Sequence, residues 1–267
     1  MANYQIAPPI KSLADLKDPP QQLFYRGRWN EDLFTKCVAV VGSRRITEYG
    51  RRVIEKLVPQ LVQDDWTIIS GFMYGVDQEA HRVCVECGGK TIAVLGWGIN
   101  WSGLGEEDIK LGKQIEQNGL VVSEWEEQQP ALWTFPARNR IVAAACQEVI
   151  VVEAAARSGA LITTEIADKL KRKIWAVPGP ITSKVSEGTN RLIASGRAQM
   201  WLPQAQLKLS LASQDPIVKV LESESLDASE IARKLNLPVG QIGARLSLLI
   251  LEGKLGEREG KYFSVVE

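Results

Sequence analysis

Six short apolar runs recur along most of the chain, and stretches with helical spacing lie between most of them. The runs occupy residues 38–41, 67–69, 91–95, 120–122, 149–152 and 174–177. Runs of this length are typical of strands buried on both faces, and most intervening segments are long enough for a helix. The pattern therefore predicts right-handed βαβ units and a Rossmann-like α/β domain, with a parallel sheet covered by helices on both faces.

The pattern changes after residue 214, where three helices and a hairpin are expected. The second helix is predicted at 228–235, a turn follows at 236–238, and the third helix carries Ile242, Leu246 and Leu249 on one apolar stripe. A glycine-containing hairpin at 254–265 completes a winged helix-turn-helix pattern. We therefore expect a Rossmann-like domain at 1–203, a linker at 204–214 and a winged-helix domain at 215–267.

A Gly-Ser-Arg-Arg turn ends the first apolar run and precedes a predicted helix. Gly42 and Ser43 offer backbone N–H groups, Arg44 and Arg45 offer full charges, and Thr47 is the expected N-cap. A strand, a tight turn and a helix N-terminus together form a common anion site. The alternative is a turn that serves only packing.

Similar turns follow the other runs, and the carboxyl ends of parallel strands meet at one edge of a sheet, where ligands bind. Arg138, Asn139 and Arg140 are expected at the start of a helix, and Asp77 is expected to cap another. The further candidates for this edge are Gly71, Gly75, Ser158, Gly159, Thr163, Gly179 and Asn190. The alternative is that the glycines merely permit tight connections.

Composition places the chain among ordinary soluble proteins. It has 267 residues, 45% of them hydrophobic, and four cysteines. No apolar run approaches the roughly 18 residues that span a bilayer, and the N-terminal segment lacks the form of a signal peptide. We therefore expect a cytoplasmic protein with no membrane partner and no disulfide framework.

Charge is unevenly distributed, although 32 Lys/Arg balance 32 Asp/Glu overall. Residues 135–200 carry ten basic and five acidic side chains, whereas residues 102–131 carry two and seven. A neutral chain can therefore have a basic face. Residues 215–267 carry seven basic and nine acidic side chains, which argues against strong duplex binding by the winged helix and favours a protein-contact or regulatory role.

The order of these motifs resembles the DNA-processing protein A family, DprA or Smf, over about residues 16–200. The motifs are VAVVGSR, SGFMYGVDQEAH, TIAVLGWGIN, FPARNRI, VVEAAARSGALIT, AVPG and SEGTNRLI. The resemblance implies a homodimer that binds and protects single-stranded DNA and helps to load the recombinase RecA in natural transformation. It also implies a phosphate loop at Gly42, Ser43 and Arg44.

The resemblance further assigns an Arg-Asn-Arg element at 138–140 and a Ser-Gly loop with Ser158, Gly159 and Thr163. Departures from the family pattern occur at Tyr74, where arginine is frequent, at Trp97 and Asn100, and at 103–104.

Single-stranded DNA needs phosphate partners and flat apolar surfaces for its bases. Arginines and helix N-termini supply the first. The aromatic candidates for stacking are Tyr74, Trp97, Trp101, Trp133 and Phe135, of which Phe135 adjoins the arginine pair. We therefore expect preferential binding of single-stranded DNA.

Enzymatic and metal chemistry have less support, and neither a cofactor nor a metal is expected. His81 is the sole histidine, and its spacing to Cys84 and Cys87 lacks a fourth metal ligand. A nucleotide-binding or nucleotide-cleaving Rossmann protein, with Glu153 and Glu165 acting on a ribose, is the alternative. A transcription regulator ranks third.

Overall fold

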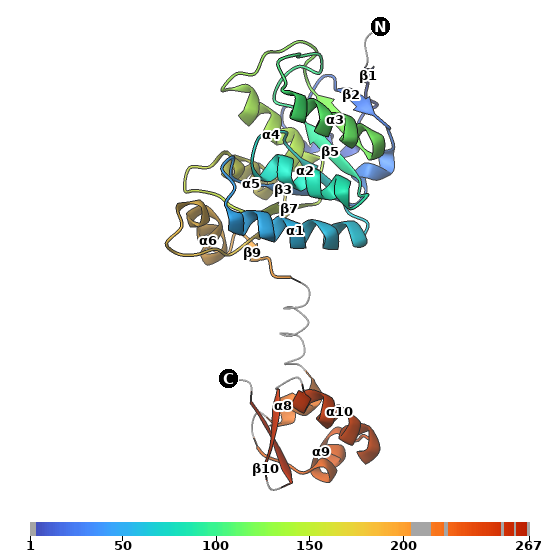
Figure 1. Cartoon of the computed structure of the whole chain (residues 1–267), viewed down its shortest axis with the longest axis vertical. Helices are drawn as coiled ribbons and strands as arrows, with labels where there is room; N and C mark the ends of the chain where they lie inside the picture. The colour runs from blue at the N-terminus through green and yellow to red at the C-terminus, as the bar shows by residue number, and fades with distance from the viewer. Residues whose placement is uncertain (1–3, 204–214, 222–223, 252–253, 259, 266–267) are drawn as a thin grey trace. The chain divides into compact units, whose positions relative to one another are not determined.

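The computed structural model of the chain describes residues 4–203, 215–221, 224–251, 254–258 and 260–265 (Figure 1). The chain divides into two compact units, Met1–Trp201 and Leu202–Glu267. The predicted linker, 204–214, lies outside the described residues.

Within the described part of the first unit, nine strands form one sheet in the order β1-β2-β6-β5-β4-β3-β7-β8-β9. The six predicted strands are β3 to β8, and each boundary falls within one residue of its prediction. Their bounds are Cys37–Val41 (β3), Thr67–Ser70 (β4), Thr91–Val94 (β5), Leu120–Ser123 (β6), Glu148–Val151 (β7) and Lys173–Ala176 (β8).

Three short strands extend this sheet beyond the predicted ones: β1 (Gln5–Ile6), β2 (Phe24–Gly27) and β9 (Gln199–Met200). β9 is parallel to β8, whereas β2 pairs with β6 and β1 pairs with β2 in the antiparallel sense. The sheet is therefore mixed, with a parallel centre. The short helices η1 (Lys11–Asp15) and η2 (Glu31–Phe34) flank β2, and η3 (Lys184–Ser186) follows β8.

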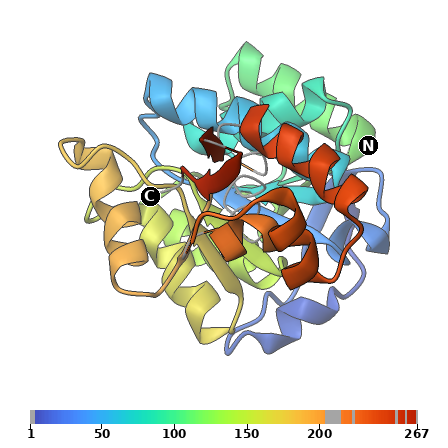
Figure 2. The ribbon, with the colours of Figure 1, turned by 90° about the horizontal axis from the view of Figure 1, so that it is seen from below.

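Helices cover both faces of the sheet, as predicted. Along β3, Val38 and Val40 pack with residues of α1 (Glu48–Gln63) and α2 (Val76–Glu86). Cys37 and Ala39 point to the opposite face, toward α4 (Thr134–Ala144) and α5 (Gly159–Lys169). α3 (Glu106–Asn118) packs beside α2, and α6 (Glu187–Ala194) packs on β8. Figure 2 shows α1 (blue) and α3 (green) on one side of this unit and α5 (yellow) on the other.

Helix starts follow the sequence expectations in one case and depart from them in two. Thr47 caps α1 and accepts a hydrogen bond from the Gly50 N–H, as predicted. Asp77 does not cap α2, because the helix begins at Val76 and Gly75 occupies the cap position. α4 begins at Thr134, so residues 138–140 lie in its middle and not at its start.

Within its described residues, the second unit contains three helices followed by a hairpin. The bounds are Pro216–Leu221 (α8), Ala228–Leu235 (α9), Val239–Leu251 (α10), Leu255–Arg258 (β10) and Lys261–Ser264 (β11). The predicted stripe of Ile242, Leu246 and Leu249 is buried in the core of this unit. Asp227 and Glu230 form a capping box at the start of α9.

None of the helices in the described ranges combines the length and the apolar character that crossing a membrane would require.

Candidate functional site

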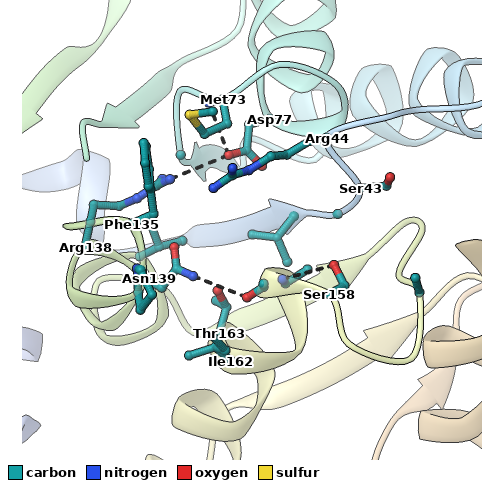
Figure 3. Close-up of a pocket in the computed structure, with 18 of the residues that line it drawn as sticks. Ser43, Arg44, Met73, Asp77, Phe135, Arg138, Asn139, Ser158, Ile162 and Thr163 are labelled. Carbon is teal, nitrogen blue, oxygen red and sulfur yellow. Dashed lines mark hydrogen bonds and ion pairs between the residues drawn. The ribbon is translucent and has the colours of Figure 1, made fainter. Parts of the chain in front are cut away.

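The direction of strand addition reverses between β3 and β7, which are parallel neighbours in the centre of the sheet. From β3 the chain continues to β4 on one side, whereas β7 and β8 lie on the other. Open α/β sheets bind ligands at such switch points, outside the carboxyl ends of the strands. A pocket of about 390 Å³ opens there, between the loops after β3, β4 and β7 and the helix α4 (Figure 3).

Most of the predicted site residues line this switch-point pocket. They are Gly42, Ser43, Arg44, Gly71, Phe135, Arg138, Asn139, Ser158, Gly159 and Thr163. These residues come from separate turns that the sequence expected to converge, and the fold brings them together. Whether they bind a nucleic acid stays a prediction.

Arg44 and Phe135 form the cationic and aromatic part of the pocket. The Arg44 side chain is exposed, and its guanidinium carbon lies 4.8 Å from the centroid of the Phe135 ring. Phe135 is half-buried and packs edge-on against Trp97, with ring centroids 6.4 Å apart. A guanidinium over an aromatic face is a favourable pairing that also leaves the cation accessible to an anion.

Arg138 lies beneath the pocket and is 3% exposed. Its Nη2 atom is 3.8 Å from Oδ2 of Asp77 (Figure 3). Gly71 makes room for this pair, because a Cβ atom there would lie 1.8 Å from Nη1 of Arg138. Asp77 also accepts a hydrogen bond from the backbone N–H of Met73 at 3.4 Å.

Burial shifts the pKa values of both Asp77 and Arg138 toward their uncharged forms. It raises the pKa of Asp77, against the lowering effect of Arg138. It lowers the pKa of Arg138, and the nearby charge of Arg44 adds to that effect while Asp77 opposes it. In the part of the chain that the structure describes, the buried Nε of Arg138 has no hydrogen-bond acceptor.

The N-terminus of α5 forms the side of the pocket opposite Arg44. Ser158 caps this helix and accepts a hydrogen bond from the Ala160 N–H at 3.3 Å. Asn139 donates from Nδ2 to the Gly159 carbonyl at 3.3 Å, which ties α4 to the start of α5 (Figure 3). A helix N-terminus carries partial positive charge, so this wall and Arg44 favour the same kind of ligand, an anion.

Four other predicted residues lie outside this pocket. Arg45 and Gly75 line a neighbouring pocket. Gly179 and Asn190 bond to each other: the Gly179 N–H donates to Oδ1 of Asn190 at 3.1 Å, and Nδ2 of Asn190 donates to the Gly179 carbonyl at 3.0 Å. This pair joins the loop after β8 to α6.

Arg140 was also expected at this edge of the sheet, but its guanidinium is bonded within the protein. Its Nη1 and Nη2 atoms bond to the two carboxylate oxygens of Glu124 at 2.8 and 2.6 Å, and its Nε donates to the Asp18 carbonyl at 3.0 Å. The side chain is 16% exposed and does not line the pocket. Successive helix positions are about 100° apart, so residues 138–140 cannot all face one site.

The structure also sorts the aromatic candidates and adds residues that sequence reasoning missed. Trp97 is 5% exposed and belongs to a core cluster, whereas Tyr74 and Trp133 are 62% and 57% exposed.

Met73, Leu132, Pro136 and Ile162 line the pocket but were not predicted. Their proximity to the predicted turns was the one signal for them, because apolar residues carry no distinctive chemistry.

His81 is a buried structural residue and is bonded at both ring nitrogens. Nδ1 lies 2.7 Å from the Thr91 hydroxyl oxygen, and Nε2 lies 2.7 Å from the Gly71 carbonyl oxygen. Burial lowers its pKa from 6.5 to about 4, so the neutral ring is the stable form. His81 therefore packs in the core and ties α2 to the turn after β4.

Comparison with known proteins matches this chain to one family. The model of that family, DNA recombination-mediator protein A, matches residues 7–211. The DNA processing protein DprA of Streptococcus pneumoniae is 41% identical over 185 residues, which are 69% of this chain and 64% of that protein. The X-ray structure of DprA from S. pneumoniae matches this chain with a TM-score of 0.66 at 40% identity, and the match covers 72% of this chain and 66% of the other.

This chain is also similar to a solved structure of DNA processing protein A from Helicobacter pylori, whose name refers to a single-stranded DNA binding mode of that protein. Its TM-score is 0.69 at 30% identity, and the match covers 79% of this chain and 96% of the other. The chain spans 51% to 64% of the length of the first three curated relatives. The fold, the order of the motifs and these matches agree, and the chain belongs to the DNA recombination-mediator protein A family.

Proposed function

We propose that this protein binds single-stranded DNA at the switch-point pocket. The observation that carries the proposal is the convergence of Arg44, Phe135 and the α5 N-terminus on one cavity. The guanidinium and the helix N-terminus suit a phosphate, and the aromatic ring offers a face for a base. The name of the H. pylori structure, which refers to single-stranded DNA, supports the same ligand.

The size and position of the pocket favour a single strand over a duplex. A cavity of about 390 Å³ at the end of a sheet has room for a unit the size of one nucleotide, whereas duplex readers place a helix or ribbon in a groove. In the second unit, the Nε of Arg245 on α10 is engaged with Asp215 at 2.8 Å. Arg245 is the one basic residue of α10, so this pair leaves the helix without an unpaired cation for a DNA backbone.

We extend the proposal to recombination. The family description, recombination mediator, supports a role in delivering single-stranded DNA to the recombinase RecA during natural transformation. The protein would act as a homodimer in the cytoplasm, with the second unit as a protein-contact or regulatory element. These assignments rest on family membership and on the sequence.

The carboxylates near the sheet edge support a binding protein rather than a nucleotide-cleaving enzyme. Glu153 is 1% exposed, and its carboxylate accepts hydrogen bonds from the backbone N–H and the hydroxyl of Thr47. Glu165 is exposed on α5 and does not line the switch-point pocket. Asp77 is paired with Arg138. Each of these groups has a structural partner or lies outside the pocket.

A competition experiment tests the proposal. Fluorescence anisotropy at one salt concentration compares a labelled single strand, the same sequence as a duplex, and a labelled mononucleotide. We expect the single strand to bind most tightly, with affinity that falls as salt rises, because bound arginines release counterions from DNA. Equal affinity for duplex and single strand would contradict the proposal. Tight mononucleotide binding with no salt dependence would favour the small-ligand alternative.

A further inference from the structure

A second cavity, of about 700 Å³, adjoins the switch-point pocket at the same edge of the sheet. It is lined by Arg51 of α1, by α2 from Gln78 to Glu86 and by α3 from Glu107 to Gln114, and these three helices are neighbours in Figure 1. Arg44 lines both cavities, so a strand bound at the first has a direct path to the second. We call the second cavity the Tyr74 pocket, after the aromatic residue at its rim.

The loop that carries Tyr74 is fixed against the loop that carries Arg44. The Val76 N–H donates to the Ser43 carbonyl at 3.1 Å. Gly75 has a φ of +86°, and a Cβ atom there would lie 2.3 Å from that same carbonyl oxygen. Glycine is required at this contact both by its backbone angle and by the close approach. Tyr74 therefore has a defined position beside Arg44.

Tyr74 has the properties of a surface for stacking. Its side chain is 62% exposed, although large aromatic side chains usually bury most of their area. No hydrogen bond or ring contact engages it within the residues that the structure describes.

Both basic and acidic side chains line the Tyr74 pocket. Arg44 and Arg45, beside Tyr74, are exposed and form no ion pair in the described ranges. Glu79 is neutralised, because it pairs with both Arg51 and Arg82.

Glu107, Asp108 and Lys110 line the pocket from α3, and Asp108 accepts a hydrogen bond from Nε2 of Gln78 at 2.8 Å. Arg44 and Arg45, beside Tyr74, therefore offer a position for a phosphate of a bound strand.

We infer that the Tyr74 pocket binds the nucleotide next to the one held at the switch-point pocket, with its base stacked on Tyr74 and its phosphate near Arg44 and Arg45. The inference rests on the proposed function. It makes Tyr74 a second base-stacking residue, apart from Phe135, and it sets the direction in which the strand leaves the first pocket.

The test compares Tyr74→Ala with Tyr74→Phe on two ligands, a single-stranded oligonucleotide and a fully abasic strand of equal length. Stacking of one base on an aromatic side chain corresponds to about fivefold in affinity or more. We expect Tyr74→Ala to lose at least that factor on the base-bearing strand and to match wild type on the abasic strand. Tyr74→Phe, which keeps the ring, should bind both strands like wild type.

Other outcomes separate this inference from the proposed function. If wild type binds the base-bearing strand and Tyr74→Ala binds it equally well, the inference is wrong and the proposed function stands. An equal loss on both strands would also overturn it, because the ring would then act without a base. Absence of any single-strand binding by wild type overturns both. Thermal melting of each variant confirms that the exposed substitution leaves the fold intact.

Discussion

Arg140 and Glu124 form a bidentate ion pair that joins the middle of α4 to the segment after β6, with N–O distances of 2.8 and 2.6 Å. Both side chains are mostly buried, at 16% and 17% exposure. A paired arrangement of this kind is among the stronger polar contacts in proteins. The Arg140 guanidinium is therefore engaged within the fold, and its part in DNA binding stays a prediction.

Arg140→Ala should reduce stability more than DNA affinity. The substitution leaves the Glu124 carboxylate partly buried without its partner, so we expect a loss of about 2 kcal/mol in the free energy of unfolding. Urea denaturation measures this loss, and anisotropy measures affinity. If the loss arises from the unpaired Glu124 carboxylate, adding Glu124→Ala to Arg140→Ala should recover part of the stability. Wild-type stability with reduced affinity would instead place Arg140 at the ligand.

Arg44→Ala should reduce affinity with little effect on the melting temperature. The side chain is exposed, and we propose that it contacts phosphate, so the loss should be about 1–3 kcal/mol in binding free energy. The slope of affinity against salt should also fall by about one unit, as expected for one lost phosphate contact.

A matched control for this variant is Arg197→Ala. Arg197 is exposed, pairs with Asp168 at 3.3 Å and does not line the switch-point pocket. Both substitutions remove one positive charge, so a general charge effect would weaken binding equally in the two. Equal affinities for Arg44→Ala and Arg197→Ala would therefore show that Arg44 makes no specific contact.

Sequence patterns predicted the sheet well where strands are buried and poorly where they are not. The strands β3 to β7 are almost wholly buried and β8 is half-buried, and their apolar runs mark them clearly. β1 and β9 are two residues long and exposed, so they leave no pattern to read. β2 is antiparallel and partly exposed, and its pairing with β6 depends on tertiary contacts.

The site was predicted at the level of turns and not at the level of side chains. Because strand ends meet at one edge, the rule for parallel sheets placed Gly42, Gly71 and Ser158 together correctly. The orientation of Arg140 and the pairing of Asp77 with Arg138 depend on exact helix starts. Patterns fix helix boundaries only to within a few residues.

Gly71→Ala tests the fit between the turn after β4 and the buried ion pair. The added Cβ would lie 1.8 Å from Nη1 of Arg138 and 2.2 Å from Oδ2 of Asp77, so the pair must move. We expect a loss of about 1–3 kcal/mol in stability together with reduced DNA affinity. Denaturation and anisotropy on the same preparation measure the two effects.

Gly112→Ala is the control for this variant. Gly112 lies within α3, and an added Cβ would meet nothing within 4 Å. Alanine in a helix interior is favoured over glycine by about 0.5–1 kcal/mol, so this variant should be at least as stable as wild type. If Gly71→Ala behaved like Gly112→Ala, the ion pair would tolerate displacement and the pocket would not depend on it.

The pH dependence of stability should report the burial of His81. Its pKa is lowered to about 4 in the folded protein, against about 6.5 in an unfolded chain. Above pH 6.5 the ring is neutral in both states and the stability is fully present. As the pH falls from about 6.5 to about 4, the unfolded chain binds the proton first, so stability falls, by roughly 3 kcal/mol over the whole interval. Below pH 4 this contribution levels off.

His81→Gln removes the titration and provides the comparison. Because His81 is the sole histidine of the chain, no other imidazole contributes between pH 7.5 and 5.5. Urea denaturation at these two pH values should show wild type losing about 1 kcal/mol more than the variant. The burial-raised pKa of Asp77 acts in the opposite direction, since it favours protonation of the folded state, but both proteins carry it. Parallel pH profiles for the two proteins would mean that the ring accepts its proton as readily in the fold as in the unfolded chain, which its bonds to Gly71 and Thr91 and its burial argue against.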